Sequence, residues 1–216
     1  MYKIYEQPFD LKKLEDNVVI IDVLRAATVA AVVSIKKPLK YYMTADEKKI
    51  RDLYNKNITS VTIGKSTKDK SFFYSYVNSP SQIWNVDLKD KVVLHRSRAC
   101  GGMLDKLKDK NVIICGFCNI QAVSDYIKDS DKDWDIVCCG FNGEEPNDED
   151  KYCAELLADS VEGDQNQIYR KLEKSDSVIC FTENKLEYPK KDKDICLTLN
   201  LISFAIRAKE NVITIL

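Results

Sequence analysis

Short apolar runs alternate with amphipathic and polar stretches along most of the chain. The clearest run, residues 18–21, consists of four β-branched residues, which is typical of a strand buried on both faces of a sheet. An Ala-rich segment follows and favours a helix to about Ser34, because Pro38 disfavours helical conformation just before it. The same patterns predict further strands over residues 3–5, 39–43, 60–64, 91–95, 111–116, 134–139 and 212–216, and further helices over 45–54, 103–107, 119–127, 149–161 and 164–173.

This order of elements predicts the fold class. Strands that alternate with helices over short connections form βαβ units, so we expect a three-layer α/β/α fold with a mainly parallel or mixed sheet. The 216 residues are enough for a single domain with its own core. Residues 18–54 and 111–161 share a strand–helix–strand–helix order, which leaves open two related subdomains, about 1–90 and 91–216. Residues 65–85 show no clear period and are predicted to form a functional loop or cover.

Charge and composition narrow the class of partner. With 33 basic and 34 acidic side chains the formal net charge is −1, which gives no electrostatic reason to expect nucleic acid or a membrane as partner. The interspersed charges of residues 68–70 and 190–194 are predicted to form solvated surface. The N-terminus lacks the apolar core of a secretory signal, and the apolar stretch 195–208 is too short to span a bilayer. We therefore expect a cytoplasmic protein whose eight cysteines are thiols. The sequence leaves open whether the chain forms a homo-oligomer.

Several familiar sites are absent from the sequence. It contains no dinucleotide fingerprint G-x-G-x-x-G, no P-loop and no G-x-S-x-G nucleophile elbow. His95 is the only histidine, so a His-rich zinc site cannot form. Cys115 and Cys118 form a C-x-x-C pair at the end of a predicted strand. This pair could be redox-active, but we favour two small apolar residues that pack at the strand end.

One carboxylate and one guanidinium, Asp22 and Arg25, follow the first buried strand. Open α/β sheets build their sites at the carboxyl ends of parallel strands, which is where this pair is expected to lie. Asp22 could instead cap the next helix and pair with Arg25, and the residues alone do not decide between these interpretations. As chemistry, the carboxylate suits Mg²⁺ or a general base, and the guanidinium suits phosphate or sulfonate. Leu24 stands where haloacid-dehalogenase-type phosphatases need a second Asp, which argues against that class.

Two further loops carry candidate chemistry. The acidic loop 141–150 follows the predicted strand 134–139, and its carboxylates suit either the start of the next helix or a hard cation. In the turn 95–102, Arg96 and Arg98 bracket Ser97 ahead of two glycines. Guanidinium groups, a hydroxyl and backbone N–H groups together suit an anion, which we favour over an exposed basic turn without a ligand.

The segment Asp22-Val23-Leu24-Arg25-Ala26-Ala27-Thr28 resembles the D-V-L-R-A-[TS]-[ST] signature of the 2-phosphosulfolactate phosphatases, the ComB-like family of coenzyme M biosynthesis. Further segments are similar to motifs of this family in the same order, so the resemblance covers nearly the whole chain. They are Gly64, the run Asn78-Ser79-Pro80, the turn 95–102, the helix start 116–123 with Asn119 and Ala122, and Asp148-Glu149-Asp150 with Ala154.

The resemblance implies an α/β fold and a Mg²⁺-dependent phosphatase that hydrolyses (2R)-phospho-3-sulfolactate to sulfolactate and phosphate. The partner would thus be a small phosphorylated acid. The metal ligands it implies are Asp22, Glu149 and Asp150. The catalytic residues would be Asp22, Arg25 and Ser97, with a metal-activated water or Asp22 itself as nucleophile. The residues implied in substrate binding are Arg25, Thr28, Asn78, Arg96, Ser97 and Asn119.

The chain departs from the family pattern beside the expected site. Lys65 stands where the family has Glu, Val77 replaces the Gly before Asn-Ser-Pro, and Arg98 and Cys100 occupy positions where small or polar residues are expected. The change at Lys65 removes a carboxylate that could ligate metal or act as a base. These departures leave an alternative open, a catalytically altered or inactive anion-binding protein that keeps the fold.

Overall fold

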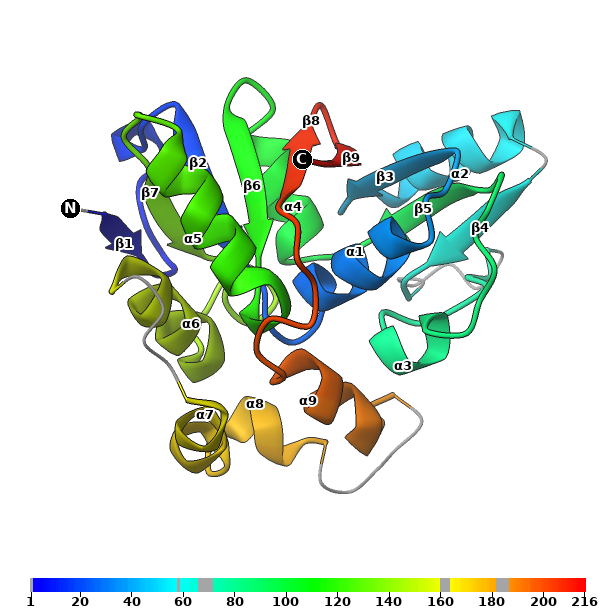
Figure 1. The fold of residues 1–216 in the computed structure, drawn as a ribbon. Helices are drawn as coiled ribbons and strands as arrows, with labels where there is room; N and C mark the ends of the chain where they lie inside the picture. The colour runs from blue at the N-terminus through cyan, green and yellow to red at the C-terminus, as the bar shows by residue number, and fades with distance from the viewer. Residues whose placement is uncertain (1, 58, 66–71, 160–163, 182–186) are drawn as a thin grey trace.

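A computed structural model describes residues 2–57, 59–65, 72–159, 164–181 and 187–216. Within these residues the strands form one mixed sheet in the order β1-β7-β2-β6-β8-β9-β3-β5-β4, and helices cover it (Figure 1). The strands are β1 (Lys3–Tyr5), β2 (Asn17–Ile21), β3 (Lys40–Thr44), β4 (Ser60–Ile63), β5 (Val92–Arg96), β6 (Asn111–Cys115), β7 (Asp135–Cys138), β8 (Ile206–Lys209) and β9 (Val212–Ile215). The α-helices are α1 (Ala26–Ile35), α2 (Glu47–Lys56), α3 (Pro80–Ile83), α4 (Cys100–Lys106), α5 (Ile120–Asp129), α6 (Asp148–Ala158), α7 (Gln165–Leu172), α8 (Asp176–Ile179) and α9 (Lys190–Cys196), and the 3₁₀ turns are η1 (Leu11–Lys13) and η2 (Phe117–Asn119).

The sheet consists of two parallel sets joined by a hairpin. Strands β1, β7, β2 and β6 are parallel to one another, and so are β3, β5 and β4. The β8–β9 hairpin pairs antiparallel with β6 on one side and with β3 on the other. The two sets therefore run in opposite directions across the hairpin. Each set combines strands from before and after residue 90, since β2 pairs with β6 and β3 pairs with β5.

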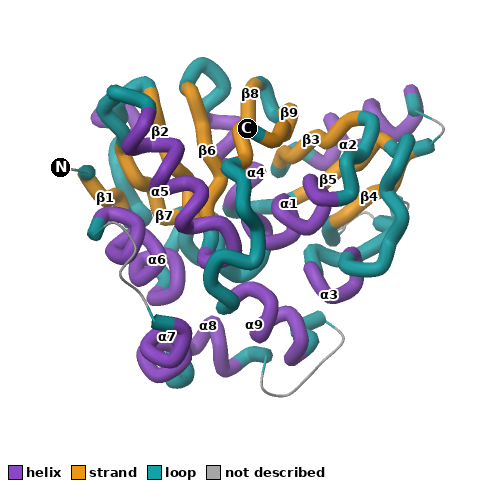
Figure 2. The backbone as a smooth tube through the Cα atoms, viewed as in Figure 1, coloured by secondary structure: helices purple, strands orange, loops and turns teal. Residues whose placement is uncertain are grey.

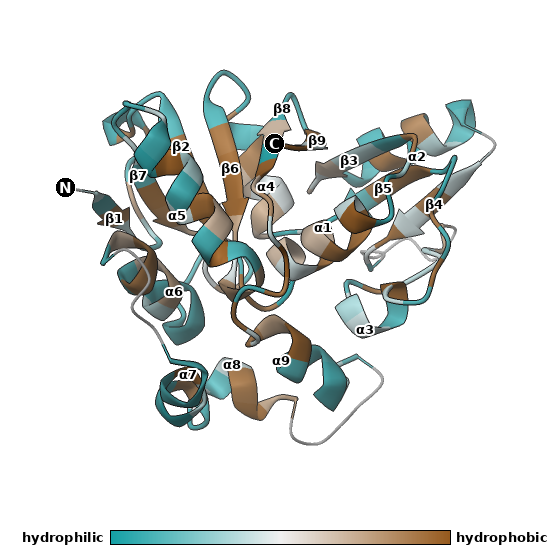
Figure 3. Cartoon of the chain, in the orientation of Figure 1, coloured by the Kyte–Doolittle hydropathy of each residue, from teal (hydrophilic) through white to brown (hydrophobic). Residues whose placement is uncertain are grey.

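The alternation of side chains along β2 assigns its two faces to different cores. Val18 and Ile20 pack in one cluster with residues of α1 and α4, whereas Val19 and Ile21 pack in another with residues of α5 and α6. Helices therefore cover both faces of this part of the sheet (Figure 2). Apolar residues make up much of β6 and α1 (Figure 3). These observations confirm the predicted α/β class with helices on both sides of a mainly parallel, mixed sheet.

The segment that follows α6 forms a layer of its own. Helices α7, α8 and α9 lie beyond the ends of the strands, below the sheet in Figure 1, and α9 contacts α3 and η2. Within the charge run 190–194, most residues are exposed or partly exposed, but Asp192 is 0% exposed. The prediction of a solvated surface is wrong for Asp192, because it shares the inward face of α9 with buried Cys196, four residues later. The second charge run, residues 68–70, lies outside the described residues.

The stretch predicted to lack regular structure contains a short helix. Ser79 caps α3 by accepting a hydrogen bond from the Gln82 N–H, and Pro80 occupies the first turn. Just before it, Tyr76 pairs with β4 at Ile63. The apolar stretch 195–208 likewise includes the end of α9 and the start of β8. The hydrophobic pattern did not reveal this change from helix to strand. In the described part of the chain no helix combines the length and hydrophobicity needed to cross a membrane.

All eight cysteines are free thiols, as predicted, and all except Cys180 are buried. The C-x-x-C pair does not form a surface site. Cys115 packs in the cluster with α5 and α6, and Cys118 packs in the cluster with α1 and α4. Burial raises the pKa of Cys118 to about 12, so its reactive thiolate form is disfavoured near neutral pH. The geometry supports a packing role for both residues.

Titration of the native protein with a thiol reagent is expected to show one fast-reacting cysteine, because only Cys180 is exposed. Cys180→Ser should remove the fast phase, and denaturant should release seven further thiols in wild type. A fast phase that survives Cys180→Ser and disappears in Cys115→Ser would contradict this expectation and revive the redox interpretation.

Candidate functional site

Asp22 lies at the carboxyl end of β2, directly before α1. One carboxylate oxygen accepts a hydrogen bond from the Ala26 N–H at 2.9 Å, and the other accepts one from the Cys100 N–H at 3.1 Å. The side chain is only 6% exposed. Asp22 thus anchors the first turn of α1, which is one of the two interpretations that the sequence left open. It also links the β5–α4 turn to the end of β2.

The N-terminus of α6 brings two more carboxylates to the same strand end. Asp150 accepts hydrogen bonds from the Val23 N–H at 2.8 Å and from the Gly140 N–H at 3.0 Å, so it joins the segments after β2 and β7. The β7–α6 loop turns sharply at Gly140, which has φ +72° and no room for a side chain, because a Cβ would lie 2.1 Å from the Glu145 carbonyl oxygen.

Glu149 is held by polar side chains. It accepts a hydrogen bond from the Asn147 amide at 2.8 Å and another from the Ser177 hydroxyl of α8. The sequence pattern did not point to Ser177, which lies 28 residues along the chain from Glu149 and follows no motif. Ser177 contacts the Glu149 carboxyl group only because the folded chain brings α8 beside the start of α6.

The three carboxylates form a buried group with unfavourable electrostatics. Glu149 and Asp150 are each 1% exposed, and burial raises the pKa of Asp22 and Asp150 and that of Glu149 to about 7. The negative charge of Asp22 raises the pKa values of the other two further. Mutually repelling carboxylates are a donor set that suits a hard divalent cation.

The arrangement of the side chains limits how these carboxylates can bind a divalent cation. Among the described residues no three His, Cys, Asp or Glu side chains converge as a group able to enclose a metal ion. Mg²⁺ does not require such an enclosure, because it commonly takes one or two carboxylates and completes its shell with water and substrate phosphate. The donor chemistry of Asp22, Glu149 and Asp150 therefore fits Mg²⁺ bound by one or two of these carboxylates, with water and substrate completing its shell.

Protonation of Glu149 should make the metal-free protein more stable at low pH. The folded-state pKa of about 7 lies above the ordinary value of 4.5, so between these pH values the folded chain binds a proton that the unfolded chain does not. This stabilisation is complete below the unfolded pKa and is lost as the pH rises through about 7. Glu149→Gln cannot ionise. Denaturant unfolding in EDTA should therefore show wild type losing up to about 3 kcal/mol relative to Glu149→Gln between about pH 5 and pH 8. A difference that does not change with pH would contradict the raised pKa.

Arg25 pairs with Asp192 rather than lying free beside Asp22. Its Nη1 donates to an Asp192 carboxylate oxygen at 2.8 Å and to the Glu187 carbonyl oxygen at 2.9 Å. The rings of Phe181 and Tyr188 lie 5.5 and 5.6 Å from the guanidinium carbon. The side chains of Arg25 and Asp192 are 10% and 0% exposed, so this is a buried ion pair. Within the described residues, Nε and Nη2 of Arg25 carry no hydrogen bond and stay available to an anion.

Asp192 also connects Arg25 to the Asn-Ser-Pro run. Its second oxygen accepts hydrogen bonds from the Ser79 hydroxyl at 2.8 Å and from the Ser81 N–H at 2.9 Å. Asn78, the first residue of this run, is partly exposed, and its side chain contacts His95. The structure therefore holds Arg25, through Asp192, beside the segment that carries Asn78, although 53 positions separate Arg25 and Asn78 in the sequence.

The basic turn after β5 lies beside this network. The Arg96 guanidinium donates to the carbonyl oxygens of Ala45 and Lys65, at 3.1 and 2.7 Å. Ser97 is 5% exposed, and its N–H is held by the Thr44 carbonyl oxygen. Arg98 is exposed. Arg96 is thus partly committed to backbone carbonyls, and the Ser97 hydroxyl has no hydrogen bond within the described residues.

Thr28 and Asn119 lie deeper than the other candidates. Thr28 is 0% exposed, and its hydroxyl lies against the thiols of Cys118 and Cys196. Asn119 is 1% exposed, and its amide closes its own turn by accepting from the Gly116 N–H and donating to the Ile114 carbonyl oxygen. Both residues lie at the start of a helix, and their contact with a substrate stays a prediction.

Lys65, the most conspicuous departure from the family pattern, has a carboxylate beside it. Its ammonium group pairs with Glu187 at 2.5 Å, and both side chains are largely solvent-exposed. Glu187 lies in the segment before α9. The backbone carbonyl oxygen of the same residue accepts a hydrogen bond from Arg25. The position that carries a carboxylate in the family is therefore occupied by an ion pair here.

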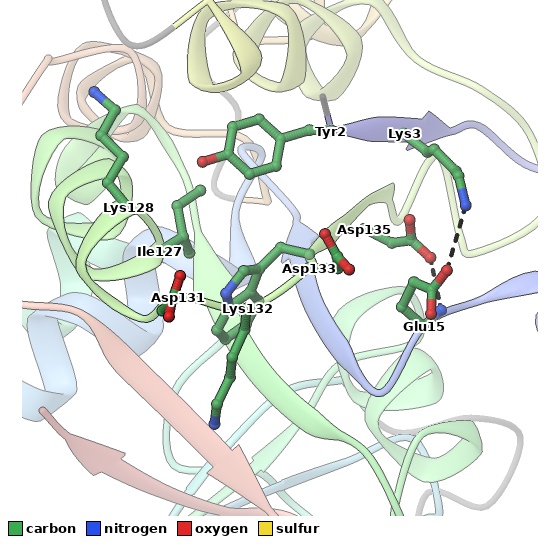
Figure 4. Close-up of a pocket in the computed structure, with 10 residues that line it drawn as sticks. Tyr2, Lys3, Glu15, Ile127, Lys128, Asp131, Lys132, Asp133 and Asp135 are labelled. Carbon is green, nitrogen blue, oxygen red and sulfur yellow. Dashed lines mark hydrogen bonds and ion pairs between the residues drawn. The ribbon is translucent and has the colours of Figure 1, made fainter.

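Cavities lie elsewhere on the molecule. One of about 610 Å³ is located at the amino ends of β1 and β7, where Lys3 and Asp135 face Glu15 (Figure 4). Another, of about 410 Å³, lies between Trp84 after α3 and residues of α9. Neither includes the carboxylates at the end of β2. We place the candidate site at the carboxyl ends of β2 and β7, because the buried carboxylates of Asp22, Glu149 and Asp150 gather there.

Comparison with known proteins shows the family to which the chain belongs. The sequence model of the 2-phosphosulpholactate phosphatase family matches residues 4–210. The chain belongs to this family. It is 28% identical over 193 residues to a probable 2-phosphosulfolactate phosphatase of Thermoplasma volcanium, with 85% of each chain covered. It is also 28% identical over 146 residues to a probable 2-phosphosulfolactate phosphatase of Caldanaerobacter subterraneus subsp. tengcongensis, which covers 66% of this chain and 60% of that protein.

Family membership confirms the resemblance carried by the segment 22–28 and the later motifs. It identifies the chain as a phosphatase-family protein, a phosphoric monoester hydrolase by class. The roles of the individual candidate residues stay predictions.

Proposed function

We propose that this protein is a Mg²⁺-dependent phosphatase that hydrolyses (2R)-phospho-3-sulfolactate, or a small phosphorylated acid of closely similar shape, to the corresponding hydroxy acid and phosphate. The observation that carries the proposal is the group of three buried carboxylates at the end of β2, with Arg25 three residues after Asp22 and its Nε and Nη2 without a hydrogen bond among the described residues. The names of the relatives support the substrate class.

In this proposal Asp22, Glu149 and Asp150 are the residues that would hold Mg²⁺. When bound, the ion would neutralise the carboxylates and polarise the phosphoryl group. Both oxygens of Asp22 already accept backbone hydrogen bonds, which lowers their nucleophilicity. We therefore favour water over Asp22 as the nucleophile. Asp22 would then serve as one of the residues that hold the metal ion.

The anionic groups of the substrate would be bound by side chains from three elements. Arg25 offers Nε and Nη2 from the start of α1, and Ser97 offers a hydroxyl from the β5–α4 turn. Asn78 offers its amide beside α3, and Arg96 offers its remaining donors. A substrate with a phosphate and a sulfonate needs two such clusters of donors, and guanidinium groups match the geometry of both anions.

The test is phosphate release from purified protein. With 2-phospho-3-sulfolactate as substrate, release is expected in Mg²⁺ and is expected to stop in EDTA and to resume when Mg²⁺ is added back. 2-Phospholactate, which lacks the sulfonate, is the matched substrate and is expected to react more slowly. Release that is equal with and without EDTA would refute the metal requirement. No release from either compound in Mg²⁺ would refute the proposed function.

A second candidate function is anion binding without turnover. Lys65 and its ion pair with Glu187 motivate it, because they stand where the family places a carboxylate. Under this alternative, 2-phospho-3-sulfolactate would bind, as measured by calorimetry, and no phosphate would be released in Mg²⁺. Lys65→Glu in that inactive protein would then be the variant expected to gain hydrolysis.

A further inference from the structure

Three polar side chains form a buried chain that ends at Asn78, the residue before the serine that binds Asp192. The Tyr41 hydroxyl on β3 lies 2.7 Å from Nδ1 of His95 on β5, and Nε2 of His95 lies 2.9 Å from Oδ1 of Asn78. His95 is 0% exposed and Tyr41 is 2% exposed, whereas Asn78 is partly exposed. The network therefore runs from the core to the surface, and only its Asn78 end can reach a ligand.

The protonation states in this network are restricted. Burial lowers the pKa of His95 to about 3, so the imidazole is neutral and carries one N–H. Burial also raises the pKa of Tyr41, so the phenol keeps its proton. Since an amide can be turned by half a rotation, two arrangements satisfy the imidazole. Either Nε2–H donates to the Asn78 oxygen, or the Asn78 NH₂ group donates to Nε2 and the proton lies on Nδ1.

The hydroxyl of Tyr41 distinguishes the two arrangements. When the proton lies on Nε2, Tyr41 donates its hydrogen to Nδ1, and all three groups are satisfied. When the proton lies on Nδ1, Tyr41 must accept from it, and its own hydrogen then has no acceptor among the described residues. A buried donor without a partner is costly, so the first arrangement is favoured.

We propose that Tyr41 and His95 are positioning residues that fix the amide of Asn78, with its carbonyl oxygen turned inward and its NH₂ group turned outward as a donor to the anionic substrate. The location of Asn78 supports this role. The next residue, Ser79, donates to Asp192, and Asp192 in turn holds Arg25. The proposal rests on the proposed function only for the identity of the anion. The orientation of the amide follows from the buried network.

The tautomer can be read directly, because His95 is the only histidine in the chain. In protein labelled with ¹⁵N-histidine, a two-bond ¹H–¹⁵N spectrum is expected to show a single neutral imidazole protonated at Nε2, unchanged between about pH 5 and pH 8. A spectrum that shows the proton on Nδ1, or an imidazole that titrates in this range, would overturn the proposal without any variant or activity assay.

Variants test whether the tautomer controls ligand binding, with inorganic phosphate as the probe. Tyr41→Phe removes the donor to Nδ1. Nδ1 then has no partner in either tautomer, so the two arrangements are expected to become similar in energy, the Nδ1–H tautomer should become populated, and phosphate binding should weaken about twofold. If the enzyme is active, KM should rise more than kcat falls. Tyr42→Phe, on the same strand but outside this network, is the matched control and should change neither the spectrum nor phosphate binding.

Asn78→Asp tests the outward donor itself. The aspartate keeps an inward oxygen for Nε2–H but presents an oxygen in place of the NH₂ group, so phosphate binding should weaken by more than in Tyr41→Phe, while Nε2 stays protonated. A tautomer change in Tyr41→Phe without weaker phosphate binding would overturn the positioning role, and so would undiminished binding by Asn78→Asp. None of these measurements requires turnover. A failure of the phosphatase assay alone would therefore refute the proposed function and leave this proposal to be decided by the spectra and the phosphate affinities.

Discussion

Asp22→Asn is expected to lower the rate of phosphate release by about 100- to 1,000-fold, the range seen when one preorganised electrostatic group is removed from a reaction site. The substitution keeps the size of the side chain but removes a negative charge from the proposed metal ligands. It also places an NH₂ group against one of the two backbone N–H donors, Ala26 or Cys100. The measurement is steady-state phosphate release from 2-phospho-3-sulfolactate in saturating Mg²⁺.

Loss of activity in this variant must be separated from loss of fold. One of the two hydrogen bonds to Asp22 is lost, so the free energy of unfolding should fall by about 1–3 kcal/mol, measured by denaturant titration without metal. Asp87→Asn is the matched control, because exposed Asp87 also accepts a backbone N–H, that of Lys89 at 3.0 Å, ahead of β5. That variant should keep full activity. A folded Asp22→Asn protein with wild-type turnover would show that Asp22 serves only to anchor α1.

Asp192→Asn is expected to be the most destabilising single substitution of a polar residue near the site. Asp192 is 0% exposed and accepts hydrogen bonds from Arg25, Ser79 and the Ser81 N–H. Removing its charge leaves the Arg25 guanidinium buried without a counter-ion, which costs about 3–5 kcal/mol. Thermal and denaturant unfolding would measure this loss.

A comparison with other variants isolates the ion pair. Asp194→Asn on the same helix is the matched control, and because Asp194 is exposed its effect should stay within about 0.5 kcal/mol. In a double-mutant cycle, Arg25→Met should be less harmful on the Asp192→Asn background than in wild type, because the unpaired charge is then gone. If Asp192→Asn behaves like Asp194→Asn, or if the two substitutions near the site are additive, the pair does not stabilise the fold as argued here.

The fold follows from local sequence patterns to a large extent. The run 18–21 and the Ala-rich segment after it become β2 and α1, and the predicted strand at 91–95 becomes β5 with a shift of one residue. The pattern failed where periodicity is short or mixed, as in α3 and β8, whereas the predicted strand 212–216 becomes β9. The direction of the two parallel sets could not be predicted, because it depends on how this hairpin pairs with β6 and β3.

The candidate site was predictable only in part. Asp22, Glu149 and Asp150 were singled out by their motifs, and the structure gathers all three at one strand end. The partners that tune them were not visible. Ser177 follows no motif, and Asp192 lay within a charge run that is otherwise exposed or partly exposed.

By itself, the sequence determined the α/β class, the buried central strand and the segment 22–28 that marks the family, because side-chain periodicity and a contiguous motif are local properties. The tertiary structure decided the partners: Asp192 for Arg25, 167 positions away, and His95 for Asn78 on a different element. The physical reason is that burial and hydrogen bonding depend on which elements pack together. A carboxylate in a charge run and a lone histidine acquire their roles only when a distant segment removes water from around them.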